Sequence, residues 1–213
     1  MRYGRVRDEL HDLVSRGHCR AGRTNIGRRP FYTSMRGIAR INVPVRPNAR
    51  STMRTVLFVC TGNTCRSPLA EAIARHHIDK GLLGAEADVF VASAGVGAMD
   101  GAPPTPEAIA TLREMGIEHE GRSKALTAQM IRNADLVLCM TAGQQSAARS
   151  LVDDDPSQSA KIQLVSKSGD VEDPIGLGQQ AYDALAAKFN TLIPARLLET
   201  MPNEDRTRIR SAR

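Results

Sequence analysis

The stretch of residues 56–72, Val-Leu-Phe-Val-Cys-Thr-Gly-Asn-Thr-Cys-Arg-Ser-Pro-Leu-Ala-Glu-Ala, constrains the fold more than any other part of this chain. Its apolar run is short and β-branched and ends at a Gly-containing loop, which predicts a buried parallel strand. The residues after Pro68 favour a helix, with Ser67 as its cap and Pro68 at its first position, where no N–H is needed. A loop that enters a helix in this way presents free N–H groups and the positive end of the helix dipole. The stretch therefore predicts an anion site.

The residues of this loop indicate which chemistry the anion undergoes. Cys60 begins the loop, and Arg66 would bind two oxygens of a phosphate held on the loop amides. The same amides, dipole and guanidinium favour the thiolate form of Cys60 near neutral pH. Ser67 can donate its hydroxyl to that sulfur, and Gly62 and Asn63 tolerate the left-handed backbone of a tight cradle. A thiolate beneath a phosphoryl group predicts a phosphocysteine intermediate. The alternative is a buried structural cysteine in an ordinary strand–loop–helix turn.

Length and composition bound the class of protein. At 213 residues the chain is predicted to be one domain, or one domain with an extension. It has no apolar run near 18 residues, so no membrane span is predicted. The four cysteines show neither a disulfide framework nor zinc spacing, which favours a reducing, cytoplasmic compartment. An aromatic content of 3% without tryptophan argues against single-strand nucleic acid binding by stacking.

The basic charge belongs to one end of the chain. Residues 1–52 contain 12 arginines and three acidic residues, a net charge of +9, whereas the 17 basic and 20 acidic residues that follow leave −3. We predict an Arg-rich, disordered extension over 1–52, a domain over 53–200, and a mobile charged tail over 201–213. A start of the native protein near Met53, with a mistranslated leader before it, is one hypothesis. A basic arm that binds RNA or another polyanion is a second. A twin-arginine export signal lacks the apolar region it requires.

From Met53 onward, strand and helix patterns alternate, which predicts a parallel sheet with right-handed crossovers. We expect an α/β fold of three layers, α/β/α, around a small four-stranded parallel sheet, with the phosphate loop between the first strand and the first helix. The remaining strands are expected at 89–92, 134–140 and 162–165. The helices are expected at 67–80, 105–116, 127–133, 144–151 and 179–198, the last disturbed at Pro194.

The motifs resemble those of the low molecular weight protein-tyrosine phosphatase family, whose signature is Cys-x5-Arg-Ser-Pro near the start of the domain. The resemblance covers about 150 residues, from Met53 to near Leu198. Further matches follow in the family's order: Ser93-Ala94-Gly95, Gly116-Ile117, Ala134–Leu138 and Asp173-Pro174.

The resemblance implies a role for each site residue. Cys60 is the nucleophile, Arg66 the phosphate clamp and Asp173 the general acid, which later activates water. Ser93 hydrogen-bonds Asn63 and supports the loop. The phosphate-binding loop is implied to comprise Thr61, Gly62, Asn63, Thr64, Cys65, Arg66 and Ser67.

Two departures from the family's pattern concern the surroundings of the loop. Gly121 stands where relatives commonly have a histidine, and the nearest histidine is His119. Met99 lies in a loop where tyrosine-specific relatives often carry a tryptophan. Gly121 in place of histidine concerns the support of the phosphate loop. Met99 in place of tryptophan concerns which substrate the site accepts.

Two phosphoprotein substrates fit the resemblance, phosphotyrosine and phosphoarginine. Thr64 stands where tyrosine-specific members usually have an apolar residue such as isoleucine, and the loop closely resembles that of the arginine-phosphatase branch. Ile175 and Gly176 follow Asp173-Pro174 in place of the tyrosines that often flank a phosphotyrosine ring. A pocket with a hydroxyl and no aromatic walls suits a planar cation better than a ring, which favours phosphoarginine.

Two other functions remain as alternatives. Thiol-linked arsenate reduction on a similar fold needs two further cysteines; Cys139 matches the first, but Ser146 stands at the second. A non-catalytic anion-binding protein would not need the full set of Cys60, Arg66, Ser67 and Asp173. The thiolate mechanism needs no cofactor or metal. Cys65 is expected to form a disulfide with oxidised Cys60 and so protect it, the alternative being a packed small residue.

Overall fold

The computed structural model describes residues 53–83 and 88–200. The predictions for residues 1–52 and 201–213, a disordered extension and a mobile tail, lie outside the described residues. The hypothesis of a native start near Met53 is not tested by the fold.

The sheet has four parallel strands in the order β2-β1-β3-β4, as the sequence predicts. These are β1 (Arg54–Cys60), β2 (Val89–Gly95), β3 (Leu136–Cys139) and β4 (Ile162–Leu164). In the register, Cys60 lies beside Gly95 on one side, and Val59 lies beside Cys139 on the other. β1 is therefore central, with β2 and β3 on opposite sides of it. The chain changes direction across the sheet at β1, and ligands of open α/β sheets bind at such a point.

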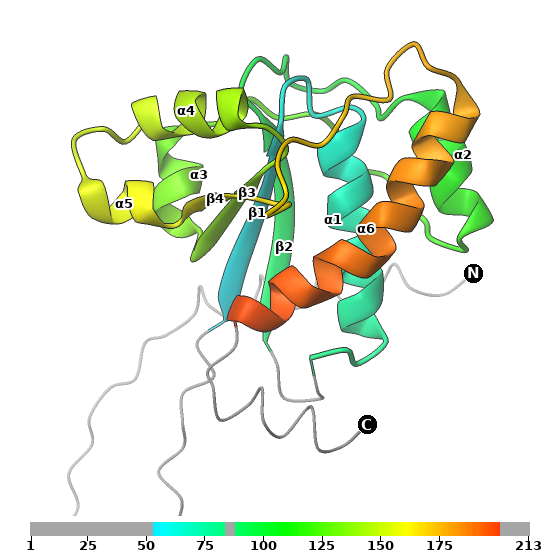
Figure 1. The fold of residues 1–213 in the computed structure, drawn as a ribbon, viewed down its shortest axis with the longest axis horizontal. Helices are drawn as coiled ribbons and strands as arrows, with labels where there is room; N and C mark the ends of the chain where they lie inside the picture. The colour runs from blue at the N-terminus through cyan, green and yellow to red at the C-terminus, as the bar shows by residue number, and fades with distance from the viewer. Residues whose placement is uncertain (1–52, 84–87, 201–213) are drawn as a thin grey trace, which may run out of the picture. The chain divides into compact units, whose positions relative to one another are not determined.

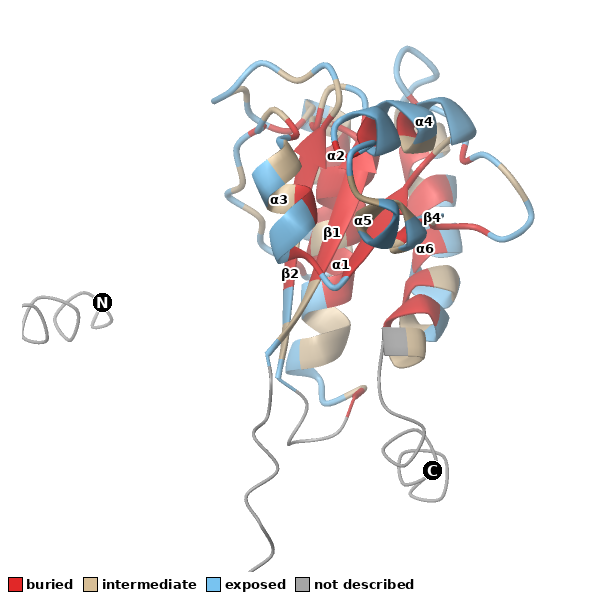
Figure 2. Ribbon diagram, turned by 90° about the vertical axis from the view of Figure 1, so that its left-hand side faces the viewer, coloured by how far each residue is buried: buried red, intermediate tan, exposed pale blue. Residues whose placement is uncertain are grey.

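Alternate side chains of β1 enter two separate cores, one on each face of the sheet, because successive side chains of a strand point to opposite faces. Val56 and Phe58 pack against α1 (Arg66–Asp79), α2 (Pro106–Glu114) and α6 (Gln179–Thr200). Leu57 and Val59 pack against α3 (Ala128–Asn133) and α4 (Ala142–Ser150). Figure 1 shows the helices on the two sides of the sheet, and Figure 2 shows that the buried residues gather around it. This confirms the three-layer architecture.

The helices agree with the sequence prediction except at three places. Ser67 is not the cap of α1: the helix begins two residues earlier than that cap predicts, with Cys65 at the N-cap and Pro68 third in the helix. A short helix, α5 (Pro156–Ala160), follows Asp155, whose side chain caps it; this segment was expected only to end the preceding helix. α6 runs through Pro194 without a break. Thr105 and Thr127 cap α2 and α3, the latter as predicted.

The carboxyl ends of the parallel strands meet at one edge of the sheet. The loop after β1, the loop after β2 and the turn between β3 and α4 all leave from that edge (Figure 1). None of the helices in the described ranges is both long and apolar enough to cross a bilayer.

Candidate active site

Cys60 ends β1, and its sulfur faces the following loop. The residue is only 2% exposed, yet Sγ lies 3.0 Å from Ser67 Oγ and accepts a hydrogen bond of 3.2 Å from the backbone N–H of Asn63. The N–H of Asn63 donates to the sulfur, and the hydroxyl of Ser67 lies within hydrogen-bond distance on a second side. Ser67 therefore contacts the sulfur of Cys60, as the sequence predicts. The second role predicted for it, the cap of α1, is wrong.

The backbone of the loop is fixed from outside. Its carbonyls accept three hydrogen bonds from neighbouring loops: Val96 N–H to Cys60 O at 3.0 Å, Gly97 N–H to Thr61 O at 3.0 Å, and Thr105 N–H to Thr64 O at 2.9 Å. The C=O and N–H of a trans peptide point in opposite directions. The N–H groups of Thr61, Gly62 and Cys65 consequently point away from these partners. They join the N–H of Asn63, which already donates to the sulfur, in a cradle of donors for an anion.

Asn63 is the left-handed residue of the loop, with φ of 55°. Its amide makes three hydrogen bonds: Nδ2 donates to Ser67 Oγ and Ser93 Oγ, both at 2.9 Å, and Oδ1 accepts from the N–H of Lys124 at 2.8 Å. Ser93 in turn donates to Glu71 Oε2 at 2.6 Å. The contact between Asn63 and Ser93 is the one that the family resemblance implies. These bonds hold a backbone conformation that a non-glycine residue adopts only at a cost.

Gly95 lets the loop approach the end of β2. A Cβ atom at this position would lie 2.3 Å from Thr61 O and 2.9 Å from Asn63 N. Both are backbone atoms of the loop, so a side chain here would displace the cradle. The Ser-Ala-Gly motif therefore requires glycine at position 95, because the backbone at the end of β2 packs directly against the backbone of the loop.

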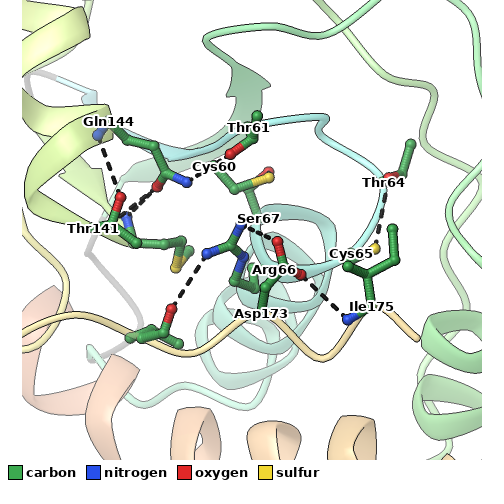
Figure 3. A network of polar contacts seen from close by, with 12 residues as sticks. Cys60, Thr61, Thr64, Cys65, Arg66, Ser67, Thr141, Gln144, Asp173 and Ile175 are labelled. Atoms are coloured by element: carbon green, nitrogen blue, oxygen red, sulfur yellow. Dashed lines mark hydrogen bonds and ion pairs between the residues drawn. The ribbon is translucent and has the colours of Figure 1, made fainter. Parts of the chain in front are cut away.

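Arg66 and Asp173 meet across the loop (Figure 3). The buried guanidinium donates through Nη1 to the carbonyl of Val171 at 3.3 Å, and through Nη2 it forms an ion pair with Asp173 Oδ2. The other carboxylate oxygen, Oδ1, accepts from the N–H of Ile175 at 3.3 Å. The side chain of Asp173 is 40% exposed, so the carboxylate borders both the solvent and the arginine that faces the loop.

Cys65 lies beside a buried tyrosine. Tyr182 of α6 donates its hydroxyl to Cys65 Sγ at 3.3 Å, and Thr64 Oγ1 is 3.6 Å from the same sulfur. Burial, together with this hydrogen bond, raises the pKa of Tyr182 to about 12. The tyrosine is therefore a neutral donor at physiological pH.

Cys139 is not part of the site. It lies in β3 with no exposed surface, and burial raises its pKa to about 12. Its thiol therefore stays protonated near neutral pH. This agrees with its expected place in the core, where its thiol is not accessible as a relay cysteine for arsenate reduction.

His119 occupies the space that the glycine at position 121 leaves open. A Cβ on Gly121 would lie 2.4 Å from His119 Nε2, and the imidazole lines a small pocket together with Asn63, Glu71 and Ser93. Burial lowers the pKa of His119, against the opposing effect of the Glu71 carboxylate. The imidazole is accordingly neutral at physiological pH. A histidine two residues upstream of Gly121 thus lies beside the residues that support the loop.

Several residues of the site were not found from the sequence. Gln144 donates to Thr61, Val171 accepts from Arg66, and Glu71 accepts from Ser93. Gln144 follows Thr141 at the spacing of a capping box, a signal for the start of α4 that places this glutamine near the edge of the sheet. Val171 and Glu71 carry no such local signal. Within residues 53–83 and 88–200, no group of three or more His, Cys, Asp or Glu side chains is placed to hold a metal ion.

Comparison with known proteins finds phosphatases of one family. The family model described as "Low molecular weight phosphotyrosine protein phosphatase" matches residues 55–206. A protein-arginine-phosphatase of Geobacillus stearothermophilus is 40% identical over 154 residues, which cover 70% of this chain and 97% of that protein. A probable low molecular weight protein-tyrosine-phosphatase of Ralstonia solanacearum is 35% identical over 138 residues, 63% of this chain and 88% of that protein.

The fold also matches that of a solved relative. The structure of the YwlE arginine phosphatase from Geobacillus stearothermophilus superposes with a TM-score of 0.59 at 36% identity, covering 69% of this chain and 94% of the other. The matched family model spans more than half of the chain and includes the loop from Cys60 to Ser67. By sequence, fold and loop geometry, the chain belongs to the low molecular weight phosphotyrosine protein phosphatase family.

Proposed function

We propose that this protein phosphatase removes the phosphoryl group from phosphoarginine side chains of proteins, through a phosphocysteine intermediate on Cys60. Phosphotyrosine is the second candidate substrate, because relatives named as tyrosine phosphatases and as arginine phosphatases match the chain to similar extents. A thiolate enzyme needs a reducing compartment, which is why we place the protein in the cytoplasm.

In the first step, the Cys60 thiolate attacks phosphorus while the phosphoryl oxygens occupy the cradle of loop N–H groups. The guanidinium of Arg66 binds two of these oxygens, which requires that it share or give up its contact with Asp173. A sulfur–phosphorus bond forms and the bond from phosphorus to the leaving group breaks. The electron pair of that bond passes to the leaving group, which takes a proton from Asp173.

In the second step, water replaces the departed group. The carboxylate of Asp173 accepts a proton from this water as its oxygen attacks phosphorus, and the sulfur–phosphorus bond breaks. Ser67, 3.0 Å from Cys60 Sγ, donates to the sulfur as it regains its negative charge. Inorganic phosphate then leaves, and the thiolate is restored.

The observation that carries the choice of phosphoarginine is Thr64, a hydroxyl residue within the phosphate loop itself. The surroundings of the site support it, because neither the segment Asp173–Gly178 nor the loop Gly97–Pro104 contains an aromatic residue. Instead, these segments present Ile175 and Met99 to solvent, 61% and 83% exposed. A pocket with a hydroxyl and no aromatic walls is better matched to a guanidinium than to a phenyl ring.

Side-by-side turnover of a phosphoarginine peptide and a phosphotyrosine peptide tests this choice. We expect wild type to favour phosphoarginine, and Thr64→Ile to shift the ratio of the two kcat/KM values by about tenfold toward phosphotyrosine. Isoleucine has an ethyl group where threonine has its hydroxyl. The substitution therefore removes a polar partner for the guanidinium of phosphoarginine and adds apolar surface for the ring of phosphotyrosine. Faster turnover of phosphotyrosine by wild type, with a ratio that Thr64→Ile leaves unchanged, would show that the substrate is phosphotyrosine.

Cys65 is proposed as the partner of Cys60 under oxidation. Hydrogen peroxide would convert the Cys60 thiolate to a sulfenic acid, and attack by the Cys65 sulfur would form a disulfide and release water. To reach Cys60, the Cys65 sulfur must leave the hydroxyl of Tyr182. After peroxide treatment, wild type should recover its activity on addition of dithiothreitol, and Cys65→Ala should not, because its sulfenic acid oxidises further. Equal, irreversible loss in both proteins would contradict this role.

A further inference from the structure

The side chain of Gln144 is buried at the start of α4, with its amide held in one orientation. It is 5% exposed, and Oε1 accepts the backbone N–H groups of Met140 and Thr141, both at 3.1 Å. A backbone N–H only donates, so the carbonyl oxygen of the amide must face these two groups. The amide nitrogen therefore faces Thr61 and donates to its Oγ1 at 3.0 Å (Figure 3).

This contact adds a second constraint to the residue after the nucleophile. Thr61 is exposed, and its carbonyl is fixed by the N–H of Gly97. The bond from Gln144 fixes its side chain as well. With both held, the peptide planes on either side of Thr61 cannot rotate freely. These are the planes whose N–H groups, those of Thr61 and Gly62, point into the cradle.

Residues 140–144, which follow β3 and include the first turn of α4, also contact the segment Val171–Asp173. Met140 O accepts from the N–H of Val171 at 2.8 Å, and Val171 O accepts from Arg66 Nη1 at 3.3 Å. Asp173 follows two residues later and pairs with the same arginine. The corner formed by residues 140–144 thus contacts the nucleophile end of the loop through Gln144 and the acid segment through Met140.

We propose that Gln144 is a positioning residue for the dephosphorylation reaction. Its amide holds Thr61, and with it the first N–H groups of the cradle, at a fixed place relative to the segment Val171–Asp173. A glutamine that only capped α4 would need the bonds to Met140 and Thr141 but not the bond to Thr61. The contact with Thr61 is what distinguishes the two roles.

A double-mutant cycle between Gln144 and Thr61 tests the proposal. Turnover of p-nitrophenyl phosphate serves as the assay, so the outcome does not depend on which phosphoprotein is the substrate. Gln144→Met and Thr61→Val should each lower kcat/KM about fivefold, the effect of one net hydrogen bond. Each should also weaken inhibition by inorganic phosphate to a similar degree. The double variant should equal the single ones, because either substitution alone breaks the same contact.

Controls separate positioning from stability. Gln145→Met removes a neighbouring amide on the same helix, whose Nε2 donates to Ile162 O at 2.9 Å away from the loop; it should keep the kcat/KM of wild type. Thr61→Val leaves the cap of α4 intact, so it remains informative if Gln144→Met fails to fold. Fivefold losses that multiply in the double variant, or wild-type activity in Thr61→Val, would overturn the proposal.

Discussion

Replacing Cys60 by serine is expected to lower kcat by at least about four orders of magnitude while phosphate binding is retained. Serine is close to cysteine in size, so the loop N–H groups and Arg66 keep their places. Its hydroxyl, however, is not ionised at neutral pH and is a far weaker nucleophile than a thiolate. Turnover of p-nitrophenyl phosphate and calorimetric titration with inorganic phosphate measure the two properties separately.

Cys139 supplies the matched control for this substitution. It is a cysteine of the neighbouring strand, fully buried, with a pKa raised to about 12 by burial. Cys139→Ala should cost about 1 kcal/mol of unfolding free energy, because it leaves a small cavity, and should keep its kcat. If Cys60→Ser retained a tenth of the wild-type kcat, or if Cys139→Ala lost as much activity, Cys60 would not be the nucleophile.

Asp173→Asn is expected to reduce kcat by about two to three orders of magnitude for a substrate with a poor leaving group. An amide cannot donate the proton that the departing group needs as its bond to phosphorus breaks. The loss should be much smaller for p-nitrophenyl phosphate, because p-nitrophenolate leaves readily without a proton. Rates measured on phenyl phosphate and on p-nitrophenyl phosphate reveal this difference.

The exposed neighbour Glu172 controls for charge. Glu172→Gln removes the same unit of negative charge one residue away, and it should leave both rates within about twofold of wild type, because surface charges act weakly through water. Equal losses on the two esters in Asp173→Asn would mean that its carboxylate only orients Arg66 and donates no proton.

The sequence predicted the sheet and the loop because their signals are local. An apolar run followed by Gly-Asn and by Ser-Pro places a strand, a turn and a helix in a short stretch of chain, whatever the rest of the protein does. The same local reasoning was wrong about Ser67. A serine before a proline normally caps a helix, but here its hydroxyl is engaged by Cys60 and Asn63 inside the loop, and the helix begins before it.

Other parts of the site depend on contacts between distant segments. Arg66 and Val171 are 105 residues apart, and Gln144 and Thr61 are 83 apart. Nothing in the sequence near either partner specifies such a pair; the parallel sheet brings them together by gathering the ends of its strands. The helix α5 has a local signal, because Asp-Pro is a common helix start. At the level of sequence, the three consecutive aspartates before Pro156 are instead interpreted as the end of the preceding helix.

The most direct test of the covalent mechanism is a mass measurement on the enzyme itself. Wild type, Cys60→Ser and Asp173→Asn are each mixed with excess p-nitrophenyl phosphate, quenched in acid during turnover and digested. Wild type should carry one added phosphoryl group on the peptide that contains Cys60, bound to sulfur, and Asp173→Asn should accumulate more of it if loss of the base slows the second step. A wild-type enzyme that turns over the ester with no phosphoryl group on Cys60 at any time would contradict the mechanism.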